Sequence, residues 1–95
     1  MQYDDFIKLT KESKPSDKLL GIHLAIWYAV KDNWDMAHNI IQEINTENAS
    51  WIHAYLHRVE GDIDNANYWY NRSRKEPCTD SLKSELDSIV QFLFS

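Results

Sequence analysis

The sequence predicts an all-α fold of about six antiparallel helices, arranged as a single domain over residues 1–95. Apolar residues recur at helical spacing along nearly the whole chain, and no stretch shows the alternation typical of a strand. Only two Gly and two Pro residues occur, which argues against a fold of many tight hairpins. Four Trp, five Tyr and three Phe supply enough large side chains to build a core in a short chain.

The first two predicted helices are separated by a polar break. The first, over residues 2–12, places Tyr3 and Phe6 on one face. Pro15 and the serines beside it end this helix and cap the next, which we predict over residues 17–31. This second helix is apolar almost all round, so we expect it to be the innermost helix of the fold.

Three further helices each follow a capping residue. The third is predicted over residues 34–44 and the fourth over residues 48–60. Gly61-Asp62 then ends the fourth helix and caps the fifth, over residues 63–74, because glycine is favoured after a helix and aspartate before one. The residues expected to point inward from the fourth and fifth helices are Ile52, Tyr55, Leu56, Val59, Ile63, Ala66 and Tyr70.

A sixth helix is predicted over residues 80–94, after Pro77 has stopped the fifth. It is expected to cap the open end of the helix stack. Phe92 and Phe94 then remain exposed, and they are a candidate homodimer contact. Its inward apolar stripe is Leu82, Leu86, Ile89, Val90 and Leu93, and its polar outer face is Lys83, Glu85, Asp87 and Gln91.

Two segments of the chain repeat one another at a fixed offset of 29 positions. Ala25 matches Ala54, and Ala37 matches Ala66. A small residue in each helix of a pair allows the two helices to approach closely where they cross. Repeats of this length usually form stacked helix pairs. The expected units are helix pairs over about 17–44 and 48–74, followed by the capping helix over about 80–94.

The second copy of the repeat resembles the tetratricopeptide pattern. A small residue, an aromatic, a Gly-Asp turn, an alanine and an aromatic follow in order in that family. Here they correspond to Ala54, His57, Gly61-Asp62, Ala66 and Tyr70, with Pro77 after them. The resemblance covers about residues 19–77 and implies a tetratricopeptide-like α-α superhelix. The chain departs from the family in its offset of 29 instead of about 34 residues, and in having His57 at the aromatic position.

A longer stretch carries a second resemblance. The segment WIHAYLHRVEGDIDNANYWYNRSRKEP, preceded by NWDMAHNIIQEI, is similar to a group of short bacterial proteins of no assigned function. This resemblance covers most of the chain after residue 20. It implies a bacterial, cytoplasmic origin and no particular reaction.

Charge and cysteine content argue against several classes of function. Ten Lys and Arg against fifteen Asp and Glu give a net charge of -5, and neither half of the chain is basic, so we expect no nucleic-acid binding. The single Cys78 excludes an intramolecular disulfide and a cysteine-based zinc site. No signal peptide is evident, and no apolar run reaches the roughly 20 residues that span a bilayer. We therefore expect a cytoplasmic protein without membrane contact.

The histidines are the strongest candidates for functional site residues. His53 and His57 are four positions apart on the fourth helix and share one face, and Glu60 follows three positions later. These side chains either line a helix–helix contact, bind a ligand or partner, or hold zinc together with Glu60. Of the three, the metal site ranks last, and we predict no cofactor. His23 and His38 are interpreted as core or rim residues.

Four further residues complete the candidate binding surface: Arg58, Trp69, Tyr70 and Arg72. Tyr68-Trp69-Tyr70 places three rings over about 200° of a helix, so at least one of them cannot share a core with Tyr70. An exposed ring beside arginine and histidine is typical of a recognition patch. The alternative is that neighbouring helices cover all three rings.

No catalytic template is present: the chain has no Gly-rich phosphate loop and no nucleophile elbow. This absence favours a binding module over an enzyme. The predicted function is a protein- or peptide-binding module, because stacked helix pairs form a concave groove that the candidate residues would border. The alternative is a small ligand- or metal-binding protein, or an enzyme, that uses the His53, His57 and Glu60 face.

Overall fold

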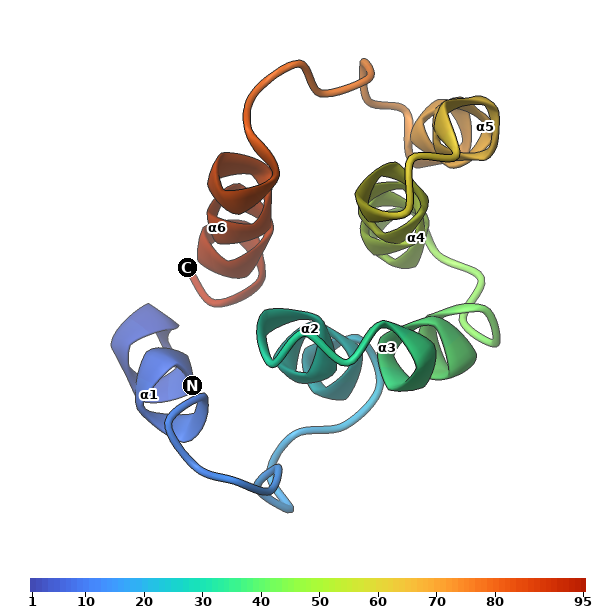
Figure 1. The fold of residues 1–95 in the computed structure, drawn as a ribbon. Coiled ribbons are helices and arrows are strands. Elements are labelled where there is room, and N and C mark those ends of the chain that lie inside the picture. The colour runs from blue at the N-terminus through green and yellow to red at the C-terminus, as the bar shows by residue number, and fades with distance from the viewer.

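The computed structural model describes all 95 residues and contains six α-helices and no strands (Figure 1), which confirms the all-α prediction. None of these helices combines the length and the apolar character needed to cross a lipid bilayer. The helices are α1 (Tyr3–Leu9), α2 (Ile22–Val30), α3 (Trp34–Ile41), α4 (Glu47–Val59), α5 (Ile63–Ser73) and α6 (Leu82–Leu93).

Four of the helices form two hairpins, α2 with α3 and α4 with α5, as Figure 1 shows. The offset of 29 positions is kept in the structure, since α2 ends at Val30 and α4 at Val59, while α3 begins at Trp34 and α5 at Ile63. The four alanines of the repeat are all buried, as a close crossing of the helices requires. The sequence repeat is therefore a repeat of helix, turn and helix.

The turns of the two hairpins are built alike. Gly61 has a φ of 82° and Asp32, at the equivalent position, has a φ of 62°. Aspartate is one of the few non-glycine residues that adopt this left-handed conformation at modest cost. Asn33 and Asp62 follow, and each accepts a hydrogen bond from a backbone N–H three positions later, at 3.2 Å. These two side chains start α3 and α5 at matching positions.

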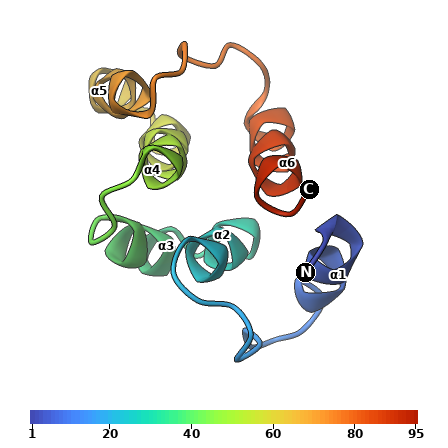
Figure 2. The same ribbon diagram turned by 180° about the vertical axis from the view of Figure 1, so that it is seen from behind.

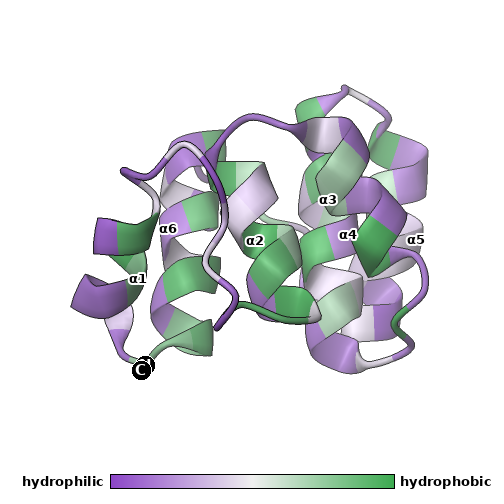
Figure 3. Cartoon of the chain, turned by 90° about the horizontal axis from the view of Figure 1, so that it is seen from below, coloured by the Kyte–Doolittle hydropathy of each residue, from purple (hydrophilic) through white to green (hydrophobic).

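A single main core lies between the hairpins, α6 and α1 (Figures 1 and 2). Figure 3 shows that α2, in the middle of that view, is largely apolar, whereas α1 and α5 at the edges carry more polar positions. The ring of Phe6 from α1 stacks on Phe94 at the end of α6, with 4.3 Å between centroids. Trp27 donates from its indole N–H to the carbonyl oxygen of Leu9, which fastens α1 to α2.

The most buried helix is α4, and not the predicted helix over residues 17–31. α4 packs against α2, α3, α5 and α6. Of α2, only Ala25, Ile26 and Trp27 are fully buried, and the helix begins at Ile22, after Gly21 with a φ of 57°. The apolar sequence of α2 therefore overstates its burial, because α4 takes the central place. The buried residues of α4 are Ala49, Ser50, Ile52, His53, Ala54, Tyr55, Leu56 and His57.

Three predictions for single residues of α6 and its end are wrong. Phe94 is 1% exposed because it stacks on Phe6, whereas Phe92 is 51% exposed as predicted. Glu85, placed on the polar outer face by the sequence, is 2% exposed. Leu82, in the predicted inward stripe, is exposed in the first turn of the helix. The face of α6 that meets α4 is therefore rotated toward Glu85.

Val59 and Ile63 are expected from the sequence to point inward, but both are exposed. They flank the turn at Gly61, at the end of α4 and the start of α5, where few neighbouring side chains can cover them. Ala66 and Tyr70, further along α5, are buried as predicted.

The two phenylalanines near the end of α6 make a matched test of this fold. Phe94→Ala should lower the free energy of unfolding by about 3–5 kcal/mol, because it removes a fully buried ring that joins α6 to α1. Phe92→Ala should cost no more than about 1 kcal/mol, because half of that ring already faces solvent. Urea unfolding followed by circular dichroism measures both. Equal losses in the two variants would contradict the arrangement of α6 on α1.

Candidate functional site

Three histidines from two helices lie together. His38 comes from α3, and His53 and His57 lie one turn apart on α4. One ring nitrogen from each residue falls within 4.8 Å of the other two. The Nε2 atoms of His38 and His53 are 3.1 Å apart. We call His38, His53 and His57 the histidine cluster.

The cluster sits where the two hairpins meet, because α3 belongs to the first hairpin and α4 to the second. Trp34 fixes this junction. Its indole N–H donates to the backbone carbonyl of Leu56 across the two helices, at 2.6 Å. Trp34 is one turn before His38 on α3, so the bond that joins α3 to α4 also sets the position of His38.

Indole rings hold two of the histidines. His38 stacks on Trp34 with 4.6 Å between ring centroids and 8° between planes. His53 stacks on Trp69 of α5 with 3.9 Å between centroids and 12° between planes. Trp69, a predicted binding residue, therefore belongs to the surroundings of the cluster. Each of these two imidazoles is stacked on one indole ring, which restricts its rotation, so packing orders the site.

Burial lowers the pKa of two of these imidazoles, those of His38 and His53. His53 and His57 are buried and His38 is half-buried. Desolvation, together with the neighbouring His38 and His57, lowers the pKa of His53 to about 4. Desolvation, followed by repulsion from His57, also lowers the pKa of His38. Both rings are therefore neutral near pH 7 and keep a lone pair for a proton donor or a metal ion.

Glu60 orients the third histidine. The Nδ1 atom of His57 is 2.6 Å from Oε1 of Glu60. When the carboxylate accepts this hydrogen bond from Nδ1 of a neutral His57, the lone pair of the ring is on Nε2. The sequence groups Glu60 with the two histidines as a possible metal ligand. The structure places its carboxylate on the outer nitrogen of His57 instead, beside Asp62.

The spacing of the nitrogens fits two chemical states. At 3.1 Å, Nε2 of His38 and Nε2 of His53 form a good hydrogen bond when one of them carries a proton. Two nitrogens bound to one tetrahedral zinc ion, each at about 2.0–2.1 Å, would lie about 3.3 Å apart. A shift of a few tenths of an ångström therefore separates the hydrogen-bonded pair from a pair of metal ligands.

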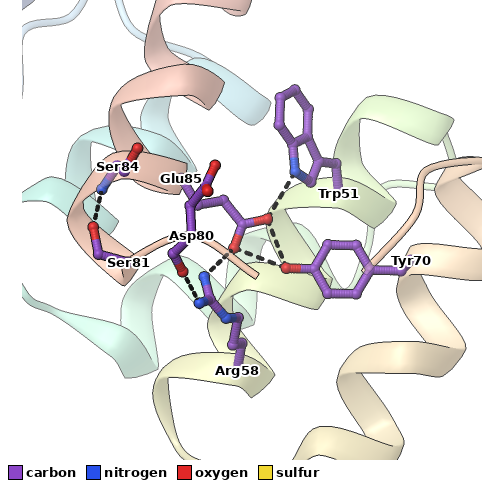
Figure 4. Close-up of polar contacts among 7 residues, drawn as sticks. All are labelled: Trp51, Arg58, Tyr70, Asp80, Ser81, Ser84 and Glu85. Carbon is purple, nitrogen blue, oxygen red and sulfur yellow. Dashed lines mark hydrogen bonds and ion pairs between the residues drawn. The ribbon is translucent and has the colours of Figure 1, made fainter. Parts of the chain in front are cut away.

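Arg58 and Tyr70, two other predicted binding residues, lie in a different cluster around Glu85 (Figure 4). The buried carboxylate of Glu85 accepts hydrogen bonds from Arg58 Nη1 at 3.0 Å and from Trp51 Nε1 at 3.1 Å. It also accepts one from the hydroxyl of Tyr70, 2.6 Å away. Arg58 donates a further hydrogen bond to the backbone carbonyl of Asp80.

This second cluster joins α4 and α5 to α6. Burial and the hydrogen bond to Glu85 raise the pKa of Tyr70, so its hydroxyl stays protonated and acts as a donor. The guanidinium of Arg58 donates its two hydrogen bonds to Glu85 and to the backbone of Asp80. Arg58 and Tyr70 therefore hold the helices together and do not border the histidine cluster.

Arg72 lies on the exposed outer side of α5. It donates to Asn45 at 3.1 Å and to the hydroxyl of Tyr68 at 3.3 Å. Its guanidinium lies 5.5 Å from the centre of the Trp69 ring. Tyr68 is 54% exposed while Tyr70 is buried, which confirms that the three consecutive rings cannot share one core.

The inner face of the helix pairs is covered by the chain itself. α6 packs against both α2 and α4, and its buried residues belong to the same core cluster as theirs (Figure 2). The concave groove that the sequence predicts for stacked helix pairs is not open on this side, because α6 packs there.

Sequence reasoning misses two residues that the structure makes important. His38 is predicted to be a core or rim residue, because its partners lie on another helix and no spacing rule connects them. Glu85 is predicted to be an outward polar residue of α6. A sequence signal for Glu85 is the set of hydrogen-bond donors on the fourth and fifth helices that need an acceptor if they are buried, namely Trp51, Arg58 and Tyr70.

Comparison of the chain with protein-family models, with curated proteins and with solved structures finds no match. A function for this chain therefore has to be inferred from the chemistry of its own residues.

Removal of Glu85 should destabilise the fold more than any surface change on α6. Glu85→Ala leaves Arg58 without its buried partner, so we expect a loss of about 3–5 kcal/mol in the free energy of unfolding. Lys83→Ala, on the exposed side of the same helix, is the control and should change it by no more than about 0.5 kcal/mol. Chemical denaturation checks both. A change below about 1 kcal/mol for Glu85→Ala would show that the network contributes little.

Proposed function

We propose that this chain binds a divalent transition-metal ion, with zinc as the reference case, through His38, His53 and His57. The observation that carries the proposal is the meeting of three imidazole nitrogens, from two helices, within 4.8 Å of one another. Imidazole is the nitrogen ligand that Zn²⁺, Cu²⁺ and Ni²⁺ prefer. The sequence ranks a metal site last, with His53, His57 and Glu60 as its candidate ligands. We propose that His38 takes the place of Glu60, and this third imidazole raises the ranking of the metal site.

A purely structural role explains the cluster less well. A helix junction needs only apolar side chains of suitable size, and three imidazoles bring polar nitrogens that each require a partner when buried. The single hydrogen bond between His38 and His53 uses one nitrogen from each ring. A bound cation would engage one lone pair from each of the three rings, which is an arrangement that three helix-contact residues do not need.

The surroundings also suit a metal ion. Stacking on Trp34 and Trp69 holds His38 and His53 in place before a metal ion binds. Glu60, on the outer nitrogen of His57, forms the carboxylate–histidine pair that commonly supports a metal ligand from behind. The low pKa of His53 keeps this ligand deprotonated, so a metal ion does not compete with protons near pH 7.

We further propose that the two hairpins stack as a tetratricopeptide-like pair, and that the metal ion joins them. Four buried alanines at a constant offset support the stacking. His38 belongs to the first hairpin and His53 and His57 to the second, so one ion would cross-link both units. Binding would then stabilise the junction as well as the site.

A protein-binding role is the second candidate, and one observation favours it. The ring of Tyr68 is 54% exposed on α5, with the guanidinium of Arg72 over it at 5.9 Å. Tyrosine and arginine are enriched at interface hot spots. A protein partner would be recognised on this outer side of α5, apart from the face that α6 covers.

Substitution of the histidines tests the metal site. Protein without a histidine tag should bind one equivalent of Zn²⁺ in isothermal titration calorimetry. His38→Ala and His53→Ala should each weaken this binding at least about a hundredfold, because two imidazoles remain. His23→Ala is the control: this histidine lies against the ring of Phe94 and takes no part in the cluster. Unchanged zinc affinity in His38→Ala and His53→Ala, with normal helix content, would refute the proposal.

Substitution of Glu60 gives a second test of the metal site, with an intermediate loss of zinc affinity expected. Glu60→Gln should weaken zinc binding by about 10- to 100-fold, because the amide orients His57 less well and makes it a weaker base. Asp64→Asn makes the same change of charge at an exposed position in the first turn of α5 and should leave the affinity unchanged. Equal effects of the two substitutions would point to general electrostatics and against a specific support of His57.

The second candidate makes a separate prediction. If Tyr68 and Arg72 contact a protein partner, Tyr68→Ser should abolish capture of that partner from the native cell. Its melting temperature and zinc affinity should remain those of the wild type, because Tyr68 is exposed. Partners retained equally by wild type and Tyr68→Ser would count against this surface.

A further inference from the structure

We infer that the metal ion held by the histidine cluster keeps an open fourth position, which binds water and exchanges it for a small anion. This inference rests on the proposed function, because it concerns the same site. Such an open centre can bind a ligand from solution, whereas in a closed structural centre the protein supplies every ligand.

The number of protein atoms that can bind the metal is the first argument. Zinc in proteins is usually four-coordinate, and the cluster offers three nitrogens. No Cys, Asp or Glu joins His38, His53 and His57 within 4.8 Å. The nearest carboxylate, that of Glu60, is engaged on Nδ1 of His57. Cys78 packs near Ala54, Ala66 and Tyr70, and its sulfur is not among the ligand atoms that gather at the cluster. The fourth ligand has to come from solution.

Charge is the second argument. Three neutral imidazole ligands leave the full double positive charge on a divalent ion. The carboxylates of Glu60 and Asp62 lie close to His57, and Asp35 lies near enough to His38 to act on it electrostatically. The guanidinium of Arg72, over the ring of Trp69, adds a positive charge on the side of His53. An anionic fourth ligand reduces the remaining positive charge at the metal, so an anion should compete with water for that position.

The shape of the surroundings limits the size of this ligand. His38, Trp34 and Trp69 are half-buried, so solvent reaches the cluster at its edge. Two surface hollows, of about 510 and 270 Å³, are lined by other residues, and none of the three histidines borders them. A site between two indole rings suits an anion of a few atoms, such as azide or acetate.

Cobalt substitution tests the inference directly. Tag-free protein is loaded with one equivalent of Co²⁺, and its visible spectrum is followed while sodium azide is added. Sodium perchlorate at equal ionic strength is the control, because perchlorate coordinates metals very weakly. We expect a saturable change in the position and intensity of the d–d bands with azide and none with perchlorate. His53→Ala with Co²⁺ should give only the weak spectrum of the hydrated ion.

The outcomes separate this inference from the proposed function. An intense four-coordinate spectrum that azide does not change would mean that the protein closes the site, and it would overturn the inference while leaving metal binding in place. A spectrum of hydrated Co²⁺ with the wild-type protein would overturn both. A spectrum that azide changes equally in wild type and His53→Ala would assign the effect to cobalt outside the cluster and would also overturn the inference.

Discussion

The burial of α4 on nearly all sides is the constraint on which the rest of this structure depends. A helix that packs against α2, α3, α5 and α6 needs small residues at its closest crossings, and Ala49 and Ala54 meet that need. It also has to satisfy every polar group that it carries inward. His53, His57 and Arg58 all lie on this helix, and each finds a partner on a neighbouring element or within one turn. No buried side-chain nitrogen or oxygen in the molecule lacks a hydrogen-bond partner.

Two polar clusters meet this requirement in different ways. Around Glu85, three donors converge on one carboxylate, so charges and hydrogen bonds are matched and nothing is left for a ligand. Around His38, imidazole rings face one another, and one hydrogen bond joins His38 to His53. The first arrangement fastens α6 to the hairpins. The second is joined by a hydrogen bond that a metal ion could replace, which is why function is sought there.

Local sequence signals account for the helices and turns, and distant contacts decide the positions that those signals do not predict. Capping residues such as Asn33 and Asp62 mark helix starts, because each bonds to a backbone N–H only three positions later. They can therefore be recognised in the sequence alone. Helical periodicity assigns a residue to a face but does not say which neighbour that face meets. The sequence misplaces Glu85 and Phe94 for that reason, since their partners lie in α4, α5 and α1. It misses His38 as a site residue because the partner of His38 is on the next helix, 15 positions away.

The contact between α1 and α6 has a consequence for how the chain folds. Tyr3 donates a hydrogen bond to Asp87, 84 positions along the chain, and Phe6 stacks on Phe94 nearby. Each hairpin, by contrast, is closed by contacts across a short turn. Because the entropy lost on closing a loop grows with its length, short-range contacts form more readily than those that join distant segments. The hairpins should therefore assemble early, and docking of α1 on α6 should be the last step to native structure.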